Sequence, residues 1–312
     1  MIFTLTLNPA IDRELLVDSL EFDSVSRVNG SRLDYGGKGF NVSRLLKGMK
    51  VDSKAVGFAG GNNGRLLEAG LKKLGIDPDF IWVAEETRTN ISIVTESHDR
   101  YIKVNEKGPF VGEDKQSELL NKILFLAKPG DWWILAGSLP PGVSNDFYAR
   151  VVNILAEHQA LAILDTCGEP LRVGCAASPF LVKPNLEEAR MLTGRTMNTI
   201  SEVTLGAREI CKLGAQNVVI SLGRAGALLR TSECAWLTHS PMVRERNPIG
   251  AGDSLVGGLV WALTQGFDLQ KALGWGVASG VATASLDGTE VGSRILIEEL
   301  YSQVQYERIE SA

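Results

Sequence analysis

The chain has 312 residues, 44% of them hydrophobic and 22% charged, which is typical of a globular α/β protein. Its formal net charge of −5 provides no basic stripe for nucleic acid and no polybasic patch for a membrane, so neither partner is expected. The start, MIFTLTLNPAIDRE, lacks the basic region of a signal peptide, and no apolar run reaches the roughly 18 residues of a membrane span. We therefore expect a cytoplasmic protein.

The predicted elements alternate between strands and helices along most of the chain. Short apolar runs predict strands at residues 2–7, 53–58, 80–83, 132–136, 161–164, 180–182 and 217–221. Apolar residues at helical spacing predict helices at 38–49, 65–74, 147–156, 186–192, 202–213, 253–264, 269–286 and 295–304. Continuous apolar strands that alternate with helices imply a mainly parallel sheet between two layers of helices.

Two polar stretches interrupt this pattern. Residues 13–35 and 89–104 alternate polar and apolar side chains, which predicts exposed strands with one apolar face. We expect a small sheet that stands off the main body. No long linker or low-complexity segment is visible, so we expect a single domain over residues 1–312. The apolar face of the small sheet would carry Leu15, Val17, Ile91 and Ile93.

The segment Gly250-Ala251-Gly252-Asp253 directly precedes a predicted helix. Small residues at a helix start let backbone N–H groups approach an anion, and the helix dipole adds positive potential. A γ-phosphate in transfer develops charge that such groups can hold, and Asp253 could accept the proton of an attacking hydroxyl. The alternative is a tight turn in which Asp253 only caps the helix.

A second glycine-rich segment, GGKGFN at residues 36–41, also starts a predicted helix. Its glycines permit close approach of a ligand, Lys38 supplies a cation, and Asn41 can bond to hydroxyl groups. The alternative is a glycine turn with a solvated lysine. Neither segment matches G-x-x-x-x-G-K-[ST], which excludes an ordinary P-loop, and the missing G-x-G-x-x-G disfavours a dinucleotide-binding oxidoreductase.

Six segments in this order resemble the PfkB (ribokinase-like) family of carbohydrate kinases, in particular its phosphosugar branch. They are TLNPAID at residues 6–12, GGKGFN, TRTN at 87–90, GSLPPG at 137–142, KPN at 183–185 followed by Glu188, and GAGD. The resemblance implies a ribokinase-like three-layer α/β sandwich with a mainly parallel central sheet. It also implies a small β-sheet lid over the sugar site, formed by about residues 13–35 and 87–107.

The resemblance assigns a sugar site near the start of the chain. Asp12 would bond sugar hydroxyls, and Gly37, Lys38 and Asn41 would line the pocket. A turn-capping role is the alternative for Asp12.

The phosphate that the sugar already carries would contact Arg88, whose guanidinium fork suits phosphate oxygens. Arg27 and Ser138 are the further candidates for this contact. An exposed lid arginine without a partner, and a rigid strand-to-helix loop around Ser138, are their alternatives.

For ATP, the resemblance assigns residues that follow later strands or lie in later helices: Lys183, Asn185, Ser221, Gly223, Gly226, Gly252 and Ser279. Asn185 and Glu188 would hold Mg²⁺ through water molecules, with Asp165 as support. A capping pair explains the same spacing of Asn185 and Glu188, a hairpin turn explains the glycines, and helix packing explains Ser279.

The implied activity is ATP-dependent phosphorylation of a ketohexose phosphate, first of all fructose 1-phosphate to fructose 1,6-bisphosphate. The hint is KVNEKGP at residues 103–109, which resembles the I-N-x-x-G-P stretch of the 1-phosphofructokinase subgroup. Phosphorylation of tagatose 6-phosphate or fructose 6-phosphate, and a sugar- or nucleotide-binding module without transfer, are the alternatives. A homodimer through the lids would cover the apolar face of the small sheet, and a monomer with a moving lid is the alternative.

Overall fold

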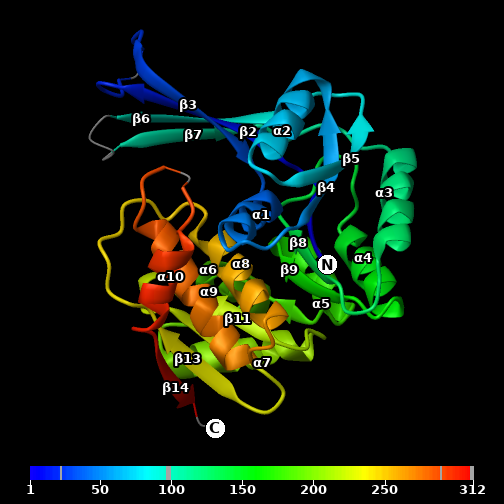
Figure 1. The fold of residues 1–312 in the computed structure, drawn as a ribbon, viewed down its shortest axis with the longest axis vertical. Helices are drawn as coiled ribbons and strands as arrows, with labels where there is room; N and C mark the ends of the chain where they lie inside the picture. Colours follow the sequence, from blue (N-terminus) through cyan, green and yellow to red (C-terminus); the bar gives the residue numbers. More distant parts are fainter. Residues whose placement is uncertain (22, 96–99, 289, 310–312) are drawn as a thin grey trace.

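The computed structural model describes residues 1–21, 23–95, 100–288 and 290–309 (Figure 1). Its large sheet is ten-stranded and contains β1 (Ile2–Thr6), β4 (Lys54–Gly60), β5 (Asp77–Val83), β8 (Trp132–Ala136), β9 (Leu161–Asp165), β10 (Leu181–Val182), β11 (Val218–Ser221), β12 (Ala227–Arg230), β13 (Ala235–His239) and β14 (Gln305–Ile309). The order is β14-β13-β12-β11-β10-β9-β8-β1-β4-β5. The strands from β11 to β5 pair in parallel, and β12, β13 and β14 add antiparallel pairs at one edge.

Helices cover both faces of this sheet, and each face has its own apolar core (Figure 1). One core is built with α3 (Glu113–Leu126), α4 (Phe147–Glu157), α5 (Gly168–Ala176), α6 (Leu186–Thr193) and α7 (Ile200–Lys212). The other is built with α1 (Lys38–Gly48), α8 (Ala251–Thr264), α9 (Leu269–Ala284) and α10 (Arg294–Tyr301). Helix α2 (Gly61–Lys73) packs with α1 and with Ile11 in a third apolar cluster. The expected three-layer α/β fold is confirmed.

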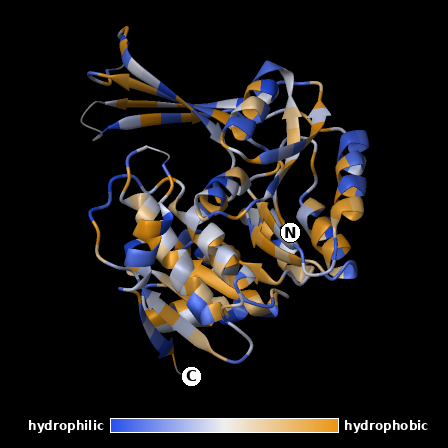
Figure 2. Ribbon diagram, viewed as in Figure 1, coloured by the Kyte–Doolittle hydropathy of each residue, from blue (hydrophilic) through white to orange (hydrophobic). Residues whose placement is uncertain are grey.

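The central strands form because their apolar runs can be buried on both faces at once. All five residues of β1 are buried, as are four of the five in β8 and in β9. Figure 2 shows apolar residues concentrated on these strands and on the helix sides that face them. None of the helices that the structure describes is both long and apolar enough to span a bilayer.

A separate four-stranded sheet stands off this body, and we call it the lid. It contains β2 (Ala10–Val17), β3 (Val28–Gly36), β6 (Arg88–Thr95) and β7 (Tyr101–Asn105), in the order β3-β2-β6-β7. Strand β2 pairs antiparallel with β3 and parallel with β6, which pairs antiparallel with β7. Part of the segment expected to be strand, residues 18–21 and 23–27, instead lies between β2 and β3 without strand structure.

Some elements were not predicted from the sequence. These are the helices α3 and α5 and the strands β12, β13 and β14. Helix α3 buries only one narrow stripe and begins with acidic residues. Strand β12 is only four residues long, and β13 and β14 contain exposed residues that weaken the apolar signal.

Candidate active site

A cavity of about 1070 Å³ lies between the lid and the carboxyl-terminal edge of the large sheet. Residues from both sheets line it: Asp12 and Arg88 come from the lid, and Asp165 and Ser221 end strands β9 and β11. In open α/β sheets, ligands bind beyond the carboxyl ends of the strands, near the point where strand order reverses. Strand β1, flanked by β4 and β8, marks that point here. The topology therefore explains why the polar residues meet at this edge.

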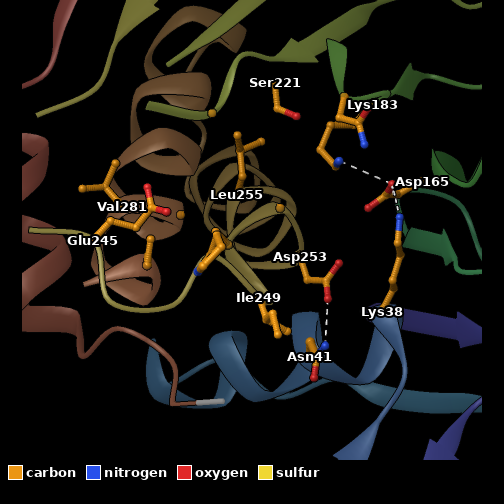
Figure 3. A pocket seen from close by; sticks show the side chains of 18 of the residues that line it. Lys38, Asn41, Asp165, Lys183, Ser221, Glu245, Ile249, Asp253, Leu255 and Val281 are labelled. Carbon is orange, nitrogen blue, oxygen red and sulfur yellow. Dashed lines mark hydrogen bonds and ion pairs between the residues drawn. The ribbon is translucent and has the colours of Figure 1, made fainter. Parts of the chain in front are cut away.

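We call the part of the cavity wall formed by Lys38, Asp165, Lys183 and Asp253 the floor. Its two lysines share the carboxylate of Asp165. Asp165 Oδ1 lies 3.1 Å from Lys38 Nζ and 3.4 Å from Lys183 Nζ (Figure 3). Burial acts to lower the pKa of Lys38, but the negative charges of Asp165, Asp253 and Glu188 outweigh it and raise that pKa. Two ammonium groups therefore share a single carboxylate here, and each has further N–H donors for an anion.

Asp253 lies beside this group in the first turn of helix α8 and is only 7% exposed. Its Oδ2 accepts a hydrogen bond of 2.7 Å from Asn41 Nδ2 (Figure 3). Burial and the neighbouring charge of Asp165 raise the pKa of Asp253 to about 6, against the opposing effects of Asn41, Lys38 and Lys183. Asp253 therefore stays largely ionised at neutral pH and is more basic than an ordinary aspartate.

The backbone at the start of α8 is shaped for close approach. Gly250 has a φ of 81°, in the left-handed region that favours glycine. The first N–H groups of a helix have no carbonyl partner within it, although Ala251 N donates to Pro248 O at 3.2 Å in the preceding turn. A methyl group at Gly252 would lie 3.6 Å from Lys183 Nζ, so the helix start and this ammonium group face the same space.

Asp12 occupies the lid side of the cavity. Its Oδ1 accepts a hydrogen bond of 2.8 Å from Asn90 Nδ2 on the neighbouring strand. A Cβ at Gly36 would lie 2.0 Å from Asp12 Oδ2, so the first glycine of GGKGFN leaves room for this carboxylate. Burial raises the pKa of Asp12, and Asn90, Lys103 and Arg88 oppose that shift.

Arg88 is held by backbone carbonyl groups. Its Nη1 donates to Glu106 O at 3.0 Å, and its Nη2 donates to Asn8 O at 2.9 Å. Its Nε is buried and has no hydrogen-bond partner among the described residues. Burial lowers the pKa of Arg88, although the negative charges of Asp12 and Glu106 act to raise it. The guanidinium group is thus fixed in the cavity wall, and each Nη keeps a second N–H that these two bonds do not use.

The far end of the cavity is formed by the loop from Ser221 to Gly226 and by more apolar residues. Strands β11 and β12 are antiparallel, so the loop is a hairpin turn, which was the alternative to a nucleotide-binding loop. Ser221, Gly223 and Gly226 nevertheless also line the cavity. Further lining residues there are Met242, Val243, Ile249, Leu255, Val277 and Val281. An apolar compartment next to a glycine-containing loop suits a flat base attached to phosphates.

Comparison with known proteins identifies the family. Residues 5–295 match the pfkB family of carbohydrate kinases. The chain belongs to this family. It is therefore a phosphotransferase that acts on an alcohol group, and the predicted resemblance is confirmed.

Relatives of this kinase span almost its whole length. It is 32% identical to a 1-phosphofructokinase of Bacillus subtilis over 99% of this chain and 100% of the relative. It is 30% identical to a tagatose-6-phosphate kinase of Staphylococcus epidermidis over 98% of this chain and 99% of the relative. The crystal structure of phosphofructokinase-2 from Escherichia coli in complex with fructose-6-phosphate superposes with a TM-score of 0.89, at 28% identity over 97% of this chain and 98% of that one.

Asn185 and Glu188 form a reciprocal helix cap. Glu188 N donates to Asn185 Oδ1, and Asn185 N donates to Glu188 Oε2, both at 2.8 Å. The capping alternative is therefore present, while both residues also line the cavity. No cluster of three or more histidine, cysteine or acidic residues suited to a metal occurs in the described part of the chain. Only one carboxylate oxygen of Glu188 is left for a metal. This suits a Mg²⁺ ion that keeps most of its water ligands, rather than one coordinated mainly by protein.

Three predicted residues do not line the cavity: Arg27, Ser138 and Ser279. Arg27 is exposed in the segment between β2 and β3. Ser138 lies outside the cavity wall, 3.4 Å from Asn8 Nδ2. Ser279 is fully buried where α9 crosses α8, and a Cβ at Gly258 would lie 2.2 Å from its Oγ. The helix-packing alternative for Ser279 therefore agrees with the structure, and its neighbours Gly280 and Val281 line the cavity instead.

Sequence reasoning also missed lining residues, namely Asn90, Lys103 and Asn105 in the lid and Arg224, Met242 and Glu245 at the far end. The lid residues had a usable signal. In strands β6 and β7, alternate residues share a face, so the polar positions of the alternating pattern indicate the cavity side.

Proposed function

We propose that this kinase transfers the γ-phosphoryl group of ATP to a ketohexose phosphate, with fructose 1-phosphate as the first candidate. The observation that carries the proposal is the position of Asp253. It is a buried, ionised carboxylate at a helix start, next to two lysines and across the cavity from Asp12 and Arg88. Relatives named 1-phosphofructokinase, including those of Bacillus subtilis and Vibrio cholerae, support the choice of substrate.

In this proposal, the floor performs the transfer. Asp253 accepts the proton of the attacking hydroxyl through the carboxylate oxygen that Asn41 leaves free. The N–H groups around Gly252 and the Lys183 ammonium group stabilise the negative charge that develops on the transferring phosphoryl oxygens. Lys38 holds Asp165 in place and adds positive charge on the sugar side.

The nucleotide would occupy the far end of the cavity, with its phosphates along the loop from Ser221 to Gly226. The capping pair of Asn185 and Glu188 would hold Mg²⁺ through water molecules. When bound, this ion would neutralise charge on the ATP phosphates.

Release of ADP in a coupled assay tests the substrate. Wild-type protein with ATP and Mg²⁺ is offered fructose 1-phosphate, fructose 6-phosphate and tagatose 6-phosphate in turn. We expect the highest kcat/KM with fructose 1-phosphate. A preference for either other sugar would reassign the substrate within the family, and no ADP release with any of the three would contradict phosphosugar transfer altogether.

We also propose that two copies pair through their lids. The lid side opposite Asp12 and Asn90 carries a cluster of apolar residues in which Leu15 pairs with Ile93, Ile93 with Ile102 and Ile91 with Val104. Leu33 lies on the same side across from Arg13. Val104 is 55% exposed and Leu33 is 41% exposed, so this face is uncovered in one copy of the chain. A small sheet with an exposed apolar face is marginally stable alone, and twofold pairing is the commonest way to bury such a face.

Light scattering at low micromolar protein, with and without substrate, tests this pairing. We expect a dimer mass in both conditions, and a shift to monomer in Val104→Glu. Met191→Glu, which changes an apolar residue that is 70% exposed on helix α6, serves as the control and should keep the dimer. A monomer mass for the wild-type protein in both conditions would contradict the dimer and leave the kinase assignment intact.

A further inference from the structure

Arg224 is the cation at the far end of the cavity. The other cations among the described lining residues are Lys38 and Lys183 of the floor and Arg88 and Lys103 of the lid. The proposed function places the phosphates of ATP along the loop that carries Arg224. Among the described lining residues, the side-chain positive charge next to that loop and beyond the floor is therefore the charge of Arg224.

The backbone of this loop is largely occupied by its own turn. Leu222 N donates to Gly226 O at 2.8 Å, and Gly226 N donates to Gly223 O at 3.1 Å. Ala225 N donates to Leu222 O at 3.3 Å. A phosphate group that lies along the loop can therefore use few of its backbone N–H groups, and a side-chain donor such as Arg224 becomes important for holding it.

Arg224 is paired across this end of the cavity with Glu245. Its Nε lies 2.7 Å from Glu245 Oε2, and this contact engages one of the five N–H donors of the guanidinium group. Glu245 belongs to the segment between β13 and α8, whereas Arg224 lies between β11 and β12. Figure 3 shows Glu245 on the side of the pocket away from Asp165 and Lys183. The ion pair thus joins two chain segments that flank the far end.

The two partners of this ion pair are held differently. The side chain of Arg224 is 82% exposed, and that of Glu245 is 25% exposed. The two residues after Glu245, Arg246 and Asn247, donate their N–H groups to Ala284 O at 2.8 and 3.1 Å, which fixes this segment to the end of α9. Exposed ion pairs contribute little because water screens their charges. Arg224 is therefore the mobile partner, and it loses little when it leaves Glu245 for a stronger anion.

We propose that the Arg224–Glu245 ion pair is a clasp across the nucleotide end, and that the phosphates of a bound nucleotide take Arg224 away from Glu245. A phosphate group offers several charged oxygens and can accept two N–H groups of the guanidinium fork at once. In the free protein Glu245 competes with the nucleotide for Arg224 and so weakens nucleotide binding. The inference rests on the proposed function and makes Glu245 a residue that sets the KM for ATP through Arg224.

Steady-state kinetics of Glu245→Gln and Arg224→Met tests the exchange. Glutamine keeps the size of Glu245 but lacks its charge, so releasing Arg224 should lower the KM for ATP by about two- to fourfold, the range of an exposed ion pair. Arg224→Met removes the donor and should raise that KM by about three- to tenfold. We expect kcat and the KM for the phosphosugar to stay within about twofold in both variants.

Matched controls come from a second exposed ion pair, which lies outside the cavity. Arg195 Nη2 is 2.6 Å from Glu209 Oε1, and neither residue lines the cavity. Glu209→Gln and Arg195→Met remove the same charges as the two test variants and should keep the wild-type KM for ATP.

The double variant separates the exchange from direct repulsion between Glu245 and the phosphates. Direct repulsion predicts the same gain from Glu245→Gln with or without Arg224. The exchange predicts that most of the gain disappears in the Arg224→Met background, because the two residues are energetically coupled. A gain of full size in that background, or no gain from Glu245→Gln alone, would overturn the clasp.

Binding of ADP and adenosine, measured by calorimetry without sugar, gives a readout that a purely structural role would not change. Glu245→Gln should lower the Kd of ADP and Arg224→Met should raise it, while the Kd of adenosine, which has no phosphate, stays at the wild-type value. Equal changes for both ligands would overturn a contact with the phosphates. Wild-type protein that binds ADP but phosphorylates none of the three sugars would contradict the proposed function, whereas active protein with unchanged ADP binding in both variants would contradict the clasp alone.

Discussion

The floor and the lid hold their charged residues in different ways. In the floor, Asp165 is 1% exposed, Lys183 is 4% exposed and Asp253 is 7% exposed, and each has a partner within 3.4 Å. In the lid, Asp12 and Arg88 are half-buried and hydrogen-bonded, whereas Lys103 and Asn105 lie on a strand whose five residues are all exposed.

This difference indicates a division of labour. Buried, paired charges need no reorganisation during the reaction, which favours stabilisation of a transition state. Exposed polar groups are solvated by water in the free protein, and they form hydrogen bonds or ion pairs only when substrate binds. We therefore expect floor variants to reduce kcat and lid variants to raise KM.

The largest effect is expected for Asp253→Asn. The amide keeps the volume and can still accept the hydrogen bond from Asn41, but it cannot act as a base. We predict a loss of about 100-fold or more in kcat, with little change in KM for either substrate. Near-normal turnover in a correctly folded variant would remove Asp253 from the mechanism.

In the lid, Arg88→Ala should raise KM for the phosphosugar by about tenfold or more, because it removes a charged donor to phosphate. KM for ATP should stay nearly fixed. Arg27→Ala is the control, since Arg27 is exposed away from the cavity, and we expect less than a twofold change. If KM for ATP rises instead in Arg88→Ala, the assignment of the two ends of the cavity is reversed.

The pH dependence of kcat/KM is the next test of the floor. A base with a pKa of about 6 is ionised and active above that pH, and it becomes protonated and inactive below it. We expect activity to fall through pH 6 by about tenfold per pH unit on the acidic side. A profile that stays flat down to pH 5 would contradict a raised pKa at the catalytic carboxylate.

The smallest effect is expected for Ser279→Ala. Its hydroxyl is buried between helices α8 and α9 and has no hydrogen-bond partner among the described residues. Its removal should leave KM for ATP within about twofold and should not reduce the melting temperature, because an unpaired buried hydroxyl contributes little to stability. A large rise in KM for ATP would restore the nucleotide contact that the sequence suggested.

The sequence predicted the parts of the site that belong to continuous motifs. Helix starts at GGKGFN and GAGD, and strand ends at Asp165 and Lys183, can be located from local patterns alone. The topology of a parallel sheet then brings them together, because the carboxyl ends of its strands share one edge.

The remaining residues depend on facts that a local pattern does not contain. Helix α9 is buried nearly all round, so its sequence does not show which side faces the cavity, and Ser279 lies on the side that packs against α8. Lys103 lies in a strand whose pairing with β6 sets it near Asp12, and that register follows from tertiary structure. Arg27 was expected within a lid strand, close to the sugar phosphate. It lies instead in the exposed segment that connects β2 and β3.

The most direct test of the division between floor and lid is a paired comparison of Asp253→Asn and Arg88→Ala. Single-turnover transfer from ATP to fructose 1-phosphate is measured over a range of sugar concentrations. We expect Asp253→Asn to lose the maximal rate and to keep the wild-type half-saturating concentration. Arg88→Ala should shift that concentration upward and recover the wild-type rate at saturation. The same pattern of loss in both variants would contradict the division.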